Sequence, residues 1–273
     1  YSLSPVSVYW VAVTGYNAPV IALATVAGLV LAERGRPWLA GAAAALGFLS
    51  SKLLALLAWP GLAAWSREGF WKRALPMALS LAAVLVLPLA GFDTLQPVSR
   101  ELLTVSAGNV WFLLRLAAPG VEATLMWKVL PPLSFLAAFA ALFLAFWRRR
   151  GGVPPEARFD TAAAMIAATN LLFMLLSRKS YTVYTAMFLL LAIHTLARDR
   201  RTLLRHLPAL TWMAAVTTLE VDLADRWKAG DGMAGLLFAV DLLLILSYLD
   251  LLAGCVRAAL ARATSPSAPA PTG

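Results

Sequence analysis

Long apolar runs separated by short clusters of charged residues are the feature that most constrains what this chain can fold into. An ordinary globular chain is about one quarter charged and hides its apolar residues in a core. Here 61% of the 273 residues are hydrophobic and only 14% are charged, which is more apolar surface than a water-soluble domain of this length buries. The sequence therefore predicts an all-α, polytopic transmembrane helical bundle.

Nine of these runs are interpreted as membrane helices that end at charged or turn-forming clusters. They lie near residues 18–32, 37–51, 53–66, 74–91, 129–147, 161–177, 182–197, 208–221 and 232–255, after an entering half-helix at 3–14. Two of them, 37–51 and 53–66, are each about 22 Å long, whereas the hydrocarbon core is about 30 Å thick. We expect this short pair to meet at Ser50-Ser51-Lys52 and to turn inside the outer boundary of the membrane, lining a cavity.

The lysine and arginine residues divide between two alternating sets of loops, and the larger set is predicted to be cytoplasmic. The larger set has fifteen members: Arg34, Arg36, Arg67, Lys72, Arg73, Arg148, Arg149, Arg150, Arg158, Arg198, Arg200, Arg201, Arg205, Arg257 and Arg262. The smaller set has eight members: Lys52, Arg100, Arg115, Lys128, Arg178, Lys179, Arg226 and Lys228. The C-terminus is then cytoplasmic, and the net charge of +9 indicates anionic lipid headgroups and not nucleic acid.

The same alternation places the stretch 92–128 outside, where its tryptophans, prolines and charges predict helices lying at the interface. We expect residues 1–262 to form one transmembrane domain and the Ser- and Pro-rich tail 263–273 to be disordered. Because Tyr1 opens within an apolar run and no signal-peptide pattern precedes it, we expect a C-terminal fragment of a longer protein. The single cysteine, Cys255, excludes an internal disulfide and a cysteine-based metal site.

Three cations are predicted at the outer ends of helices: Lys52, Arg178 and Lys179. A charge near hydrocarbon is costly, so such a residue usually has a partner or a function. An anion in the outer leaflet, such as the phosphate of a lipid carrier, is the natural partner. The alternative is structural: Lys52 extends its ammonium to water, and Arg178 with Lys179 simply ends a helix.

Several short motifs then follow one another along the chain. The first are Gly15-Tyr16-Asn17, Arg34-Gly35-Arg36, Leu39-Ala40-Gly41, Ser51-Lys52 and Trp59-Pro60. Their order resembles the GT-C superfamily of membrane glycosyltransferases, which take sugars from polyprenyl- or dolichyl-phosphate carriers. Ala107-Gly108-Asn109-Val110-Trp111 resembles an outer N-x-W element of that superfamily. The segment 177–184 resembles a late element in which a lysine precedes a hydroxyl residue and a tyrosine.

The resemblance covers about residues 1–197, and it is closest to bacterial polyprenyl-phosphate-mannose mannosyltransferases and the catalytic subunit of GPI mannosyltransferase. It implies inverting transfer of a sugar from a polyprenyl-phosphate carrier to a glycan or lipid acceptor. The two closest subgroups imply that the sugar is mannose. The reaction would occur on the outer face of a bacterial inner (plasma) membrane. The resemblance further implies a catalytic aspartate upstream of Tyr1, a carrier phosphate near Lys52, and a cavity beside Asn17. Parts of the superfamily use a divalent metal, but the sequence supplies no set of ligands for one.

Polar and aromatic residues near the outer cations are the predicted lining of the substrate cavity. Asn109 and Trp111 belong to it through the N-x-W element. Tyr16 and Asn17 form a turn, where Asn17 either contacts a sugar hydroxyl or caps a helix. The rings of Tyr181 and Tyr184 either stack on a sugar or belong to the aromatic belt of the interface.

A hydroxyl acceptor needs a general base, and no outer acid stands out by its spacing. These acids are Asp93, Glu101, Glu122, Glu220, Asp222, Asp225 and Asp231. In the last helix, Asp241 and Asp250 are nine residues apart and therefore face opposite sides. Asp241 fits a packing or hydrogen-bonding role better than a proton relay, and Asp250 is spaced to bond Arg257. His194 fits a structural role at the cytoplasmic interface, and one histidine makes no metal site.

Two other functions remain open. A transporter or flippase for a lipid or small solute would need polar residues through the depth of the membrane, for which Asn170, Asp241 and Asp250 are candidates. The second alternative is a non-catalytic membrane subunit with the same fold.

Overall fold

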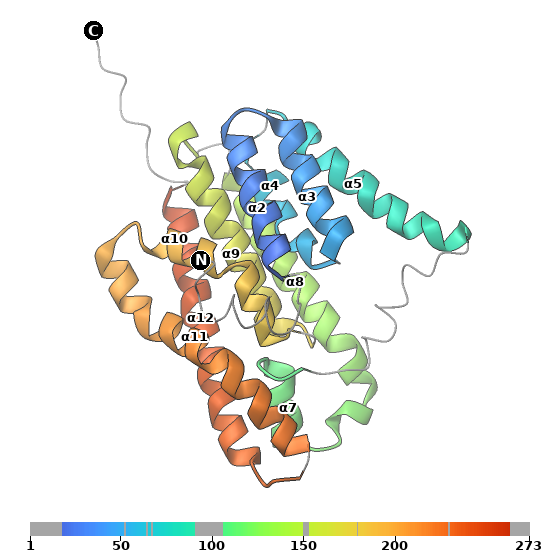
Figure 1. Cartoon of the computed structure of the whole chain (residues 1–273), viewed down its shortest axis with the longest axis vertical. Helices are drawn as coiled ribbons and strands as arrows, with labels where there is room; N and C mark the ends of the chain where they lie inside the picture. Colours follow the sequence, from blue (N-terminus) through green and yellow to red (C-terminus); the bar gives the residue numbers. More distant parts are fainter. Residues whose placement is uncertain are drawn as a thin grey trace.

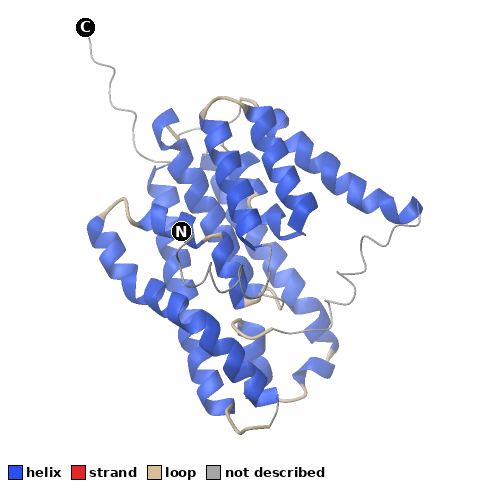
Figure 2. Ribbon diagram, viewed as in Figure 1, coloured by secondary structure: helices blue, strands red, loops and turns tan. Residues whose placement is uncertain are grey.

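The fold is known from a computed structural model, which describes residues 18–51, 53–63, 65–66, 68–90, 106–149, 153–178, 180–228 and 230–262. All regular structure in these residues is helical (Figure 2). The predicted all-α class is therefore confirmed for the described part of the chain. The half-helix 3–14, the turn containing Tyr16 and Asn17, the residues Lys52 and Lys179, and the tail 263–273 lie outside the described residues.

Figure 1 shows the labelled α-helices, coloured along the sequence from blue to red. The α-helices are α2 (Ala18–Glu33), α3 (Pro37–Ser51), α4 (Trp59–Ala63), α5 (Phe70–Val86), α7 (Val110–Ala117), α8 (Leu125–Arg149), α9 (Arg158–Leu176), α10 (Leu189–Leu196), α11 (Arg200–Lys228) and α12 (Ala234–Arg262). The 3-10 segments are η2 (Leu53–Leu57), η3 (Leu87–Ala90), η4 (Val121–Ala123), η6 (Pro155–Ala157) and η7 (Thr182–Met187).

Three stretches of the described chain are long and apolar enough to cross a membrane: Leu125–Arg149, Pro155–Leu176 and Ala234–Ala261. Two shorter apolar helices, Val20–Glu33 and Pro37–Leu49, accompany them. The chain therefore has the composition of an integral membrane protein, while the predicted set of nine membrane helices is not confirmed.

Two of the predicted helices are each broken into two pieces. The run 53–66 divides at Ala58 into η2 and α4. Pro60 gives a physical reason, because it has no N–H to donate to the carbonyl four residues earlier and its ring crowds that carbonyl. The run 182–197 divides at Phe188 into η7 and α10. The segment Thr182–Met187 is rich in β-branched residues, which lose side-chain freedom in a helix.

The helix predicted at 208–221 is much longer than expected. α11 extends from Arg200 to Lys228, because its charged ends continue the helix beyond the apolar run that indicated it. Arginine, leucine and lysine are good helix formers, so the loss of hydrophobicity does not end a helix. Asp199 begins α11 by accepting hydrogen bonds from the backbone N–H and hydroxyl of Thr202, and these bonds lower the pKa of the Asp199 carboxyl.

α9 lies at the centre of the bundle, and α8 lies at its edge. Every residue from Thr161 to Leu172 is buried. In the most apolar window of each helix, 78% of α9 is buried but only 11% of α8. Five alanines of α9 lie between residues 162 and 168, and these small side chains allow neighbouring helices to approach α9 closely. The exposed leucines of α8, α12 and α5 then form the surface that acyl chains would cover.

The described contacts define two ends of the bundle. At the Arg34 end, Gly69 lies against Pro37, Phe70 packs on Trp147, and Trp65 packs on Phe159. At the Arg178 end, residues 106–127 meet residues 176–178, 227 and 241. The printed contacts place Arg73 and Arg198 of the larger basic set at the Arg34 end, and Arg115 and Arg178 of the smaller set at the Arg178 end.

Close helix contacts at the Arg34 end depend on glycines and on a buried arginine. A Cβ added to Gly41 of α3 would lie 2.5 Å from the carbonyl oxygen of Arg73 in α5. The buried Arg73 guanidinium donates to the carbonyls of Leu62 and Ser66 at 2.9 and 2.6 Å. It thereby adds donors for carbonyls at and just beyond the end of α4, where a helix leaves its last carbonyls short of partners; the Leu62 carbonyl also accepts from the Trp65 N–H at 3.4 Å. The small-residue start of α3 therefore has a structural function.

We predict that Gly41→Ala destabilises the protein, because α3 or α5 must move to admit the methyl group. The expected cost is about 1–3 kcal/mol, typical of overpacking. Gly235→Ala is the matched control: nothing lies within 4 Å of its added Cβ, and alanine favours a helix over glycine. Thermal unfolding in one detergent compares the two, and equal melting temperatures for Gly41→Ala and wild type would contradict the assigned contact.

Candidate functional site at the Arg178 end

Two segments that the sequence marked as outer elements are hydrogen-bonded to each other. The backbone N–H of Ser106 donates to the carbonyl of Arg178 at 2.9 Å, and its hydroxyl donates to the same oxygen at 3.2 Å. These partners are 72 residues apart in the chain. The structure thus brings the N-x-W element to the break between α9 and η7.

Asn109 holds this junction together. Its Oδ1 accepts from the backbone N–H groups of Trp111 and Phe112 at 3.0 and 3.1 Å and so caps the start of α7. Its Nδ2 donates to the carbonyl of Ser106 at 2.8 Å and, at 3.5 Å, to that of Arg178. Asparagine is a preferred N-cap residue, which accounts for the start of α7 at this point. The side chain is fully buried, so a sugar would have to replace one of these partners to bind it.

Trp111 and Arg178 are linked through Trp127. The indole Nε1 of Trp111 donates to the carbonyl of Leu176 at 2.6 Å, and its ring packs edge-on against Trp127 at 6.0 Å. The guanidinium of Arg178 donates from Nη1 to the carbonyl of Trp127 at 3.2 Å. Partial burial lowers the pKa of Arg178, yet an arginine keeps its charge at physiological pH. A cation is thus held among aromatic rings where helices end.

The two predicted tyrosines pack against each other. The rings of Tyr181 and Tyr184 meet edge-on with centroids 5.6 Å apart, and Tyr184 also packs on Phe173 of α9. Tyr184 is buried, whereas Tyr181 is only partly covered. Tyr181 is accordingly the one of the two with surface available for a ligand, and its stacking on a sugar stays a prediction.

Asp241 contacts this site, which sequence spacing did not reveal. Its Oδ2 accepts from the backbone N–H of Gly108 at 3.2 Å, across 133 residues of chain. The hydrogen-bonding role predicted for Asp241 is therefore confirmed. Asp250 faces away, as expected, but it bonds His206 Nδ1 at 2.6 Å. Arg257, its expected partner, instead donates through Nε to the carbonyl of Ala253.

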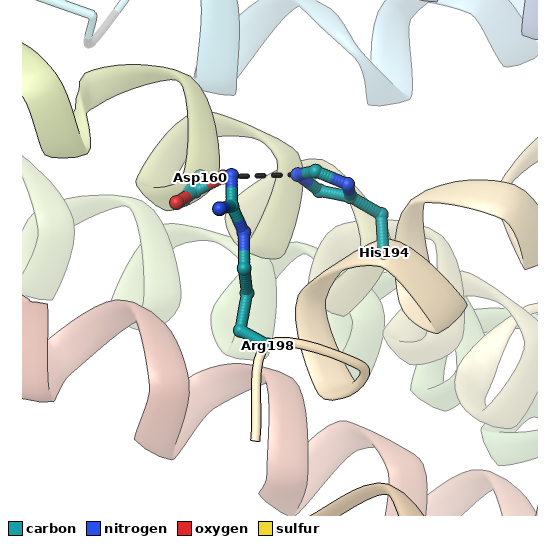
Figure 3. Close-up of polar contacts among 3 residues, drawn as sticks. All are labelled: Asp160, His194 and Arg198. Carbon is teal, nitrogen blue, oxygen red and sulfur yellow. Dashed lines mark hydrogen bonds and ion pairs between the residues drawn. The ribbon is translucent and has the colours of Figure 1, made fainter. Parts of the chain in front are cut away.

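A second polar cluster lies at the Arg34 end, where α9 begins and α10 ends (Figure 3). Asp160 Oδ1 lies 2.9 Å from His194 Nε2 and 2.7 Å from Arg198 Nη2. The cluster joins the first turn of α9, where an acid favours the helix dipole, to the end of α10. This agrees with the structural role expected of His194.

Fewer contacts are described for the remaining predicted residues. Lys52, Lys179, Tyr16 and Asn17 lie outside the described residues, as do Asp93 and Glu101, and the side chains of Glu122, Glu220 and Asp222 are likewise not described. Asp225 and Asp231 are exposed at the Arg178 end. Within the described ranges, no group of three or more His, Cys, Asp or Glu side chains is placed to hold a metal ion.

Comparison with known proteins adds no relative: no protein-family model matches the chain, and no curated protein or solved structure is significantly similar to it. The described fold defines a helical protein with three helices suited to crossing a membrane.

We predict that Asn109→Ala loosens the junction, because α7 loses its cap and Ser106 loses a donor. Loss of such a cap costs about 0.5–2 kcal/mol. Asn109→Asp is the matched variant, since a carboxylate still accepts from Trp111 and Phe112 but cannot donate to Ser106. We expect it to fall between wild type and Asn109→Ala in thermal unfolding. Wild-type stability of Asn109→Ala would show that the cap contributes nothing.

Proposed function

We propose that the protein is an integral membrane glycosyltransferase whose Arg178 end binds the phosphate of a polyprenyl-phosphate sugar, with mannose as the sugar. The observation that carries this proposal is the hydrogen-bonded junction between 106–111 and 176–184. Both segments resemble elements of the GT-C superfamily, and they meet around one cation. Separate structural roles for the two motifs would not require them to lie together.

The chemistry of Arg178 supports a phosphate as the ligand. A guanidinium presents planar N–H donors that match phosphate oxygens, and it is less strongly hydrated than an ammonium. Its backbone is fixed by Ser106 and its side chain by the carbonyl of Trp127, so little freedom remains to be lost on binding. Lys52 and Lys179 belong to the same proposal as further phosphate ligands.

The proposed membrane orientation follows from the charges at the two ends. The Arg34 end belongs to the larger set of basic loops and is assigned to the cytoplasm by the positive-inside rule. The Arg178 end then faces outward in a bacterial inner membrane. A carrier with its acyl chain in the outer leaflet would bring its phosphate to this level, beside the apolar surfaces of α8 and α12.

The proposed reaction is an inverting transfer. An acceptor hydroxyl attacks the anomeric carbon, the bond from that carbon to the phosphate oxygen breaks, and the electron pair leaves with the lipid phosphate. A carboxylate accepts the hydroxyl proton, and the cations stabilise the departing phosphate. No described residue is assigned this role.

A lipid or solute transporter is the second candidate, and one observation favours it. Polar side chains are buried within the helices: Asn170 in α9, His206 in α11 and Asp241 in α12, and His206 bonds the partly exposed Asp250 of α12. Ionisable groups inside a membrane often mark a transport pathway. Solute flux in proteoliposomes without sugar transfer would favour this function over the enzyme.

We predict that Arg178→Gln weakens binding of a polyprenyl phosphate to the full-length gene product in nanodiscs. Loss of one charge-assisted hydrogen bond corresponds to a weakening of about tenfold to a hundredfold. Lys128→Gln removes an exposed charge at the same end and should change the affinity less than about threefold. Equal affinities for Arg178→Gln and wild type would remove Arg178 from the proposed site, and sugar transfer should fall in parallel with binding.

The orientation can be tested separately by thiol labelling in a Cys255→Ser background. We predict that Lys52→Cys reacts with a membrane-impermeant maleimide added to intact cells, because the turn at 50–52 is assigned to the outer face. Arg36→Cys, in an exposed turn at the Arg34 end, should react only after permeabilisation. The reverse pattern would contradict the orientation and the enzyme proposal together.

A further inference from the structure

Asp241 is fully buried in α12 and makes a single described hydrogen bond, to the backbone N–H of Gly108. Its Oδ1 has no hydrogen-bond partner among the described residues. A buried carboxyl group is costly in an apolar environment, and an apolar side chain at this point of a membrane helix would avoid the cost. An acid here therefore indicates a specific task.

The backbone that Asp241 holds has little room to move. Gly108 has a φ of +84°, a conformation that favours glycine. A Cβ at this position would lie 3.0 Å from the Thr182 methyl group and 3.4 Å from Leu244. The segment 106–109 therefore lies in close contact with both η7 and α12. The hydrogen bond from Gly108 to Asp241 fixes the position of this segment along α12.

A continuous set of hydrogen bonds leads from Asp241 to Arg178. Gly108 donates to Asp241, and its neighbour Asn109 donates to the carbonyls of Ser106 and Arg178. Ser106 in turn donates twice to the carbonyl of Arg178. The position of the Arg178 backbone therefore depends on the segment that Asp241 anchors.

We propose that Asp241 is a positioning residue: through Gly108 and the segment 106–109 it fixes Arg178 where a lipid phosphate is bound. The role in binding rests on the function proposed above, whereas the mechanical link does not. Asp241 acts through its acceptor oxygen, so its effect requires a hydrogen-bond acceptor of this size and does not require a negative charge.

The test compares Asp241→Ala, Asp241→Asn and Asn170→Ala in the full-length protein in nanodiscs. Asp241→Asn keeps an acceptor for Gly108. Asn170 is a matched control, because it is also buried in a central helix but bonds only the carbonyl of Ile166 among the described residues. Two quantities are measured: affinity for a polyprenyl phosphate, and amide hydrogen exchange of peptides covering 106–112 and 177–182.

We expect Asp241→Ala to weaken binding about tenfold, as loss of one anchoring hydrogen bond allows, and to quicken exchange in both peptides. Asp241→Asn should stay within about twofold of wild type, and Asn170→Ala should leave both peptides unchanged. In an Arg178→Gln background, Asp241→Ala should weaken binding no further, because the two residues act as one unit.

Three results would overturn the inference: unchanged exchange at 177–182 in Asp241→Ala, an additive effect with Arg178→Gln, or a loss in Asp241→Asn as large as in Asp241→Ala. The last would show that the charge itself is needed. If the wild type binds no polyprenyl phosphate, the proposed function fails, while the exchange data still decide the mechanical link. If Asp241→Ala does not fold, Gly108→Ala perturbs the same link from the other side and takes its place.

Discussion

The need to satisfy backbone polar groups without water is the constraint on which this structure depends. Each helix end leaves carbonyl and N–H groups without helical partners, and hydrocarbon offers none. At the Arg178 end, the break after α9 leaves the carbonyls of Leu176 and Arg178, and the indole of Trp111, Ser106 and Asn109 supply donors to them. At the Arg34 end, the buried Arg73 adds donors for the carbonyls of Leu62 and Ser66, at and just beyond the end of α4. The candidate site is thus built from the same hydrogen bonds that satisfy the backbone carbonyls at the helix ends.

Apolar runs predicted most of the helices because hydrophobicity decides which segments leave water. They located α2, α3, α8, α9 and α12 well, since those helices are apolar to near their ends. They failed at α11, whose charged ends remain helical, and at 53–66 and 182–197, where a proline and β-branched residues divide the runs. Hydrophobicity alone leaves the number of full spans open: three stretches of the described chain are long and apolar enough to cross a membrane, and the predicted set of nine is not confirmed.

The site was predictable in part. Asn109, Trp111 and Arg178 were recognised from local motifs, and the structure places them together. The bonds that join them were not predictable, since Asp241 is 133 residues from Gly108 and Asp250 is 44 residues from His206. Spacing along one helix showed that Asp241 and Asp250 face opposite sides, but it says nothing about which distant segment each one meets.

The polar groups of α11 and α12 also bear on the choice between an enzyme and a transporter. A transport pathway needs polar groups that exchange partners as the protein changes shape. Here Asp241 joins α12 to the segment 106–109, and Asp250 joins α12 to α11, so each described bond ties separate elements together. Gly254 lies close against His206, which leaves that pair little room to rearrange. Bonds of this kind stiffen a bundle, and a stiff bundle better suits a protein whose chemistry takes place at one end.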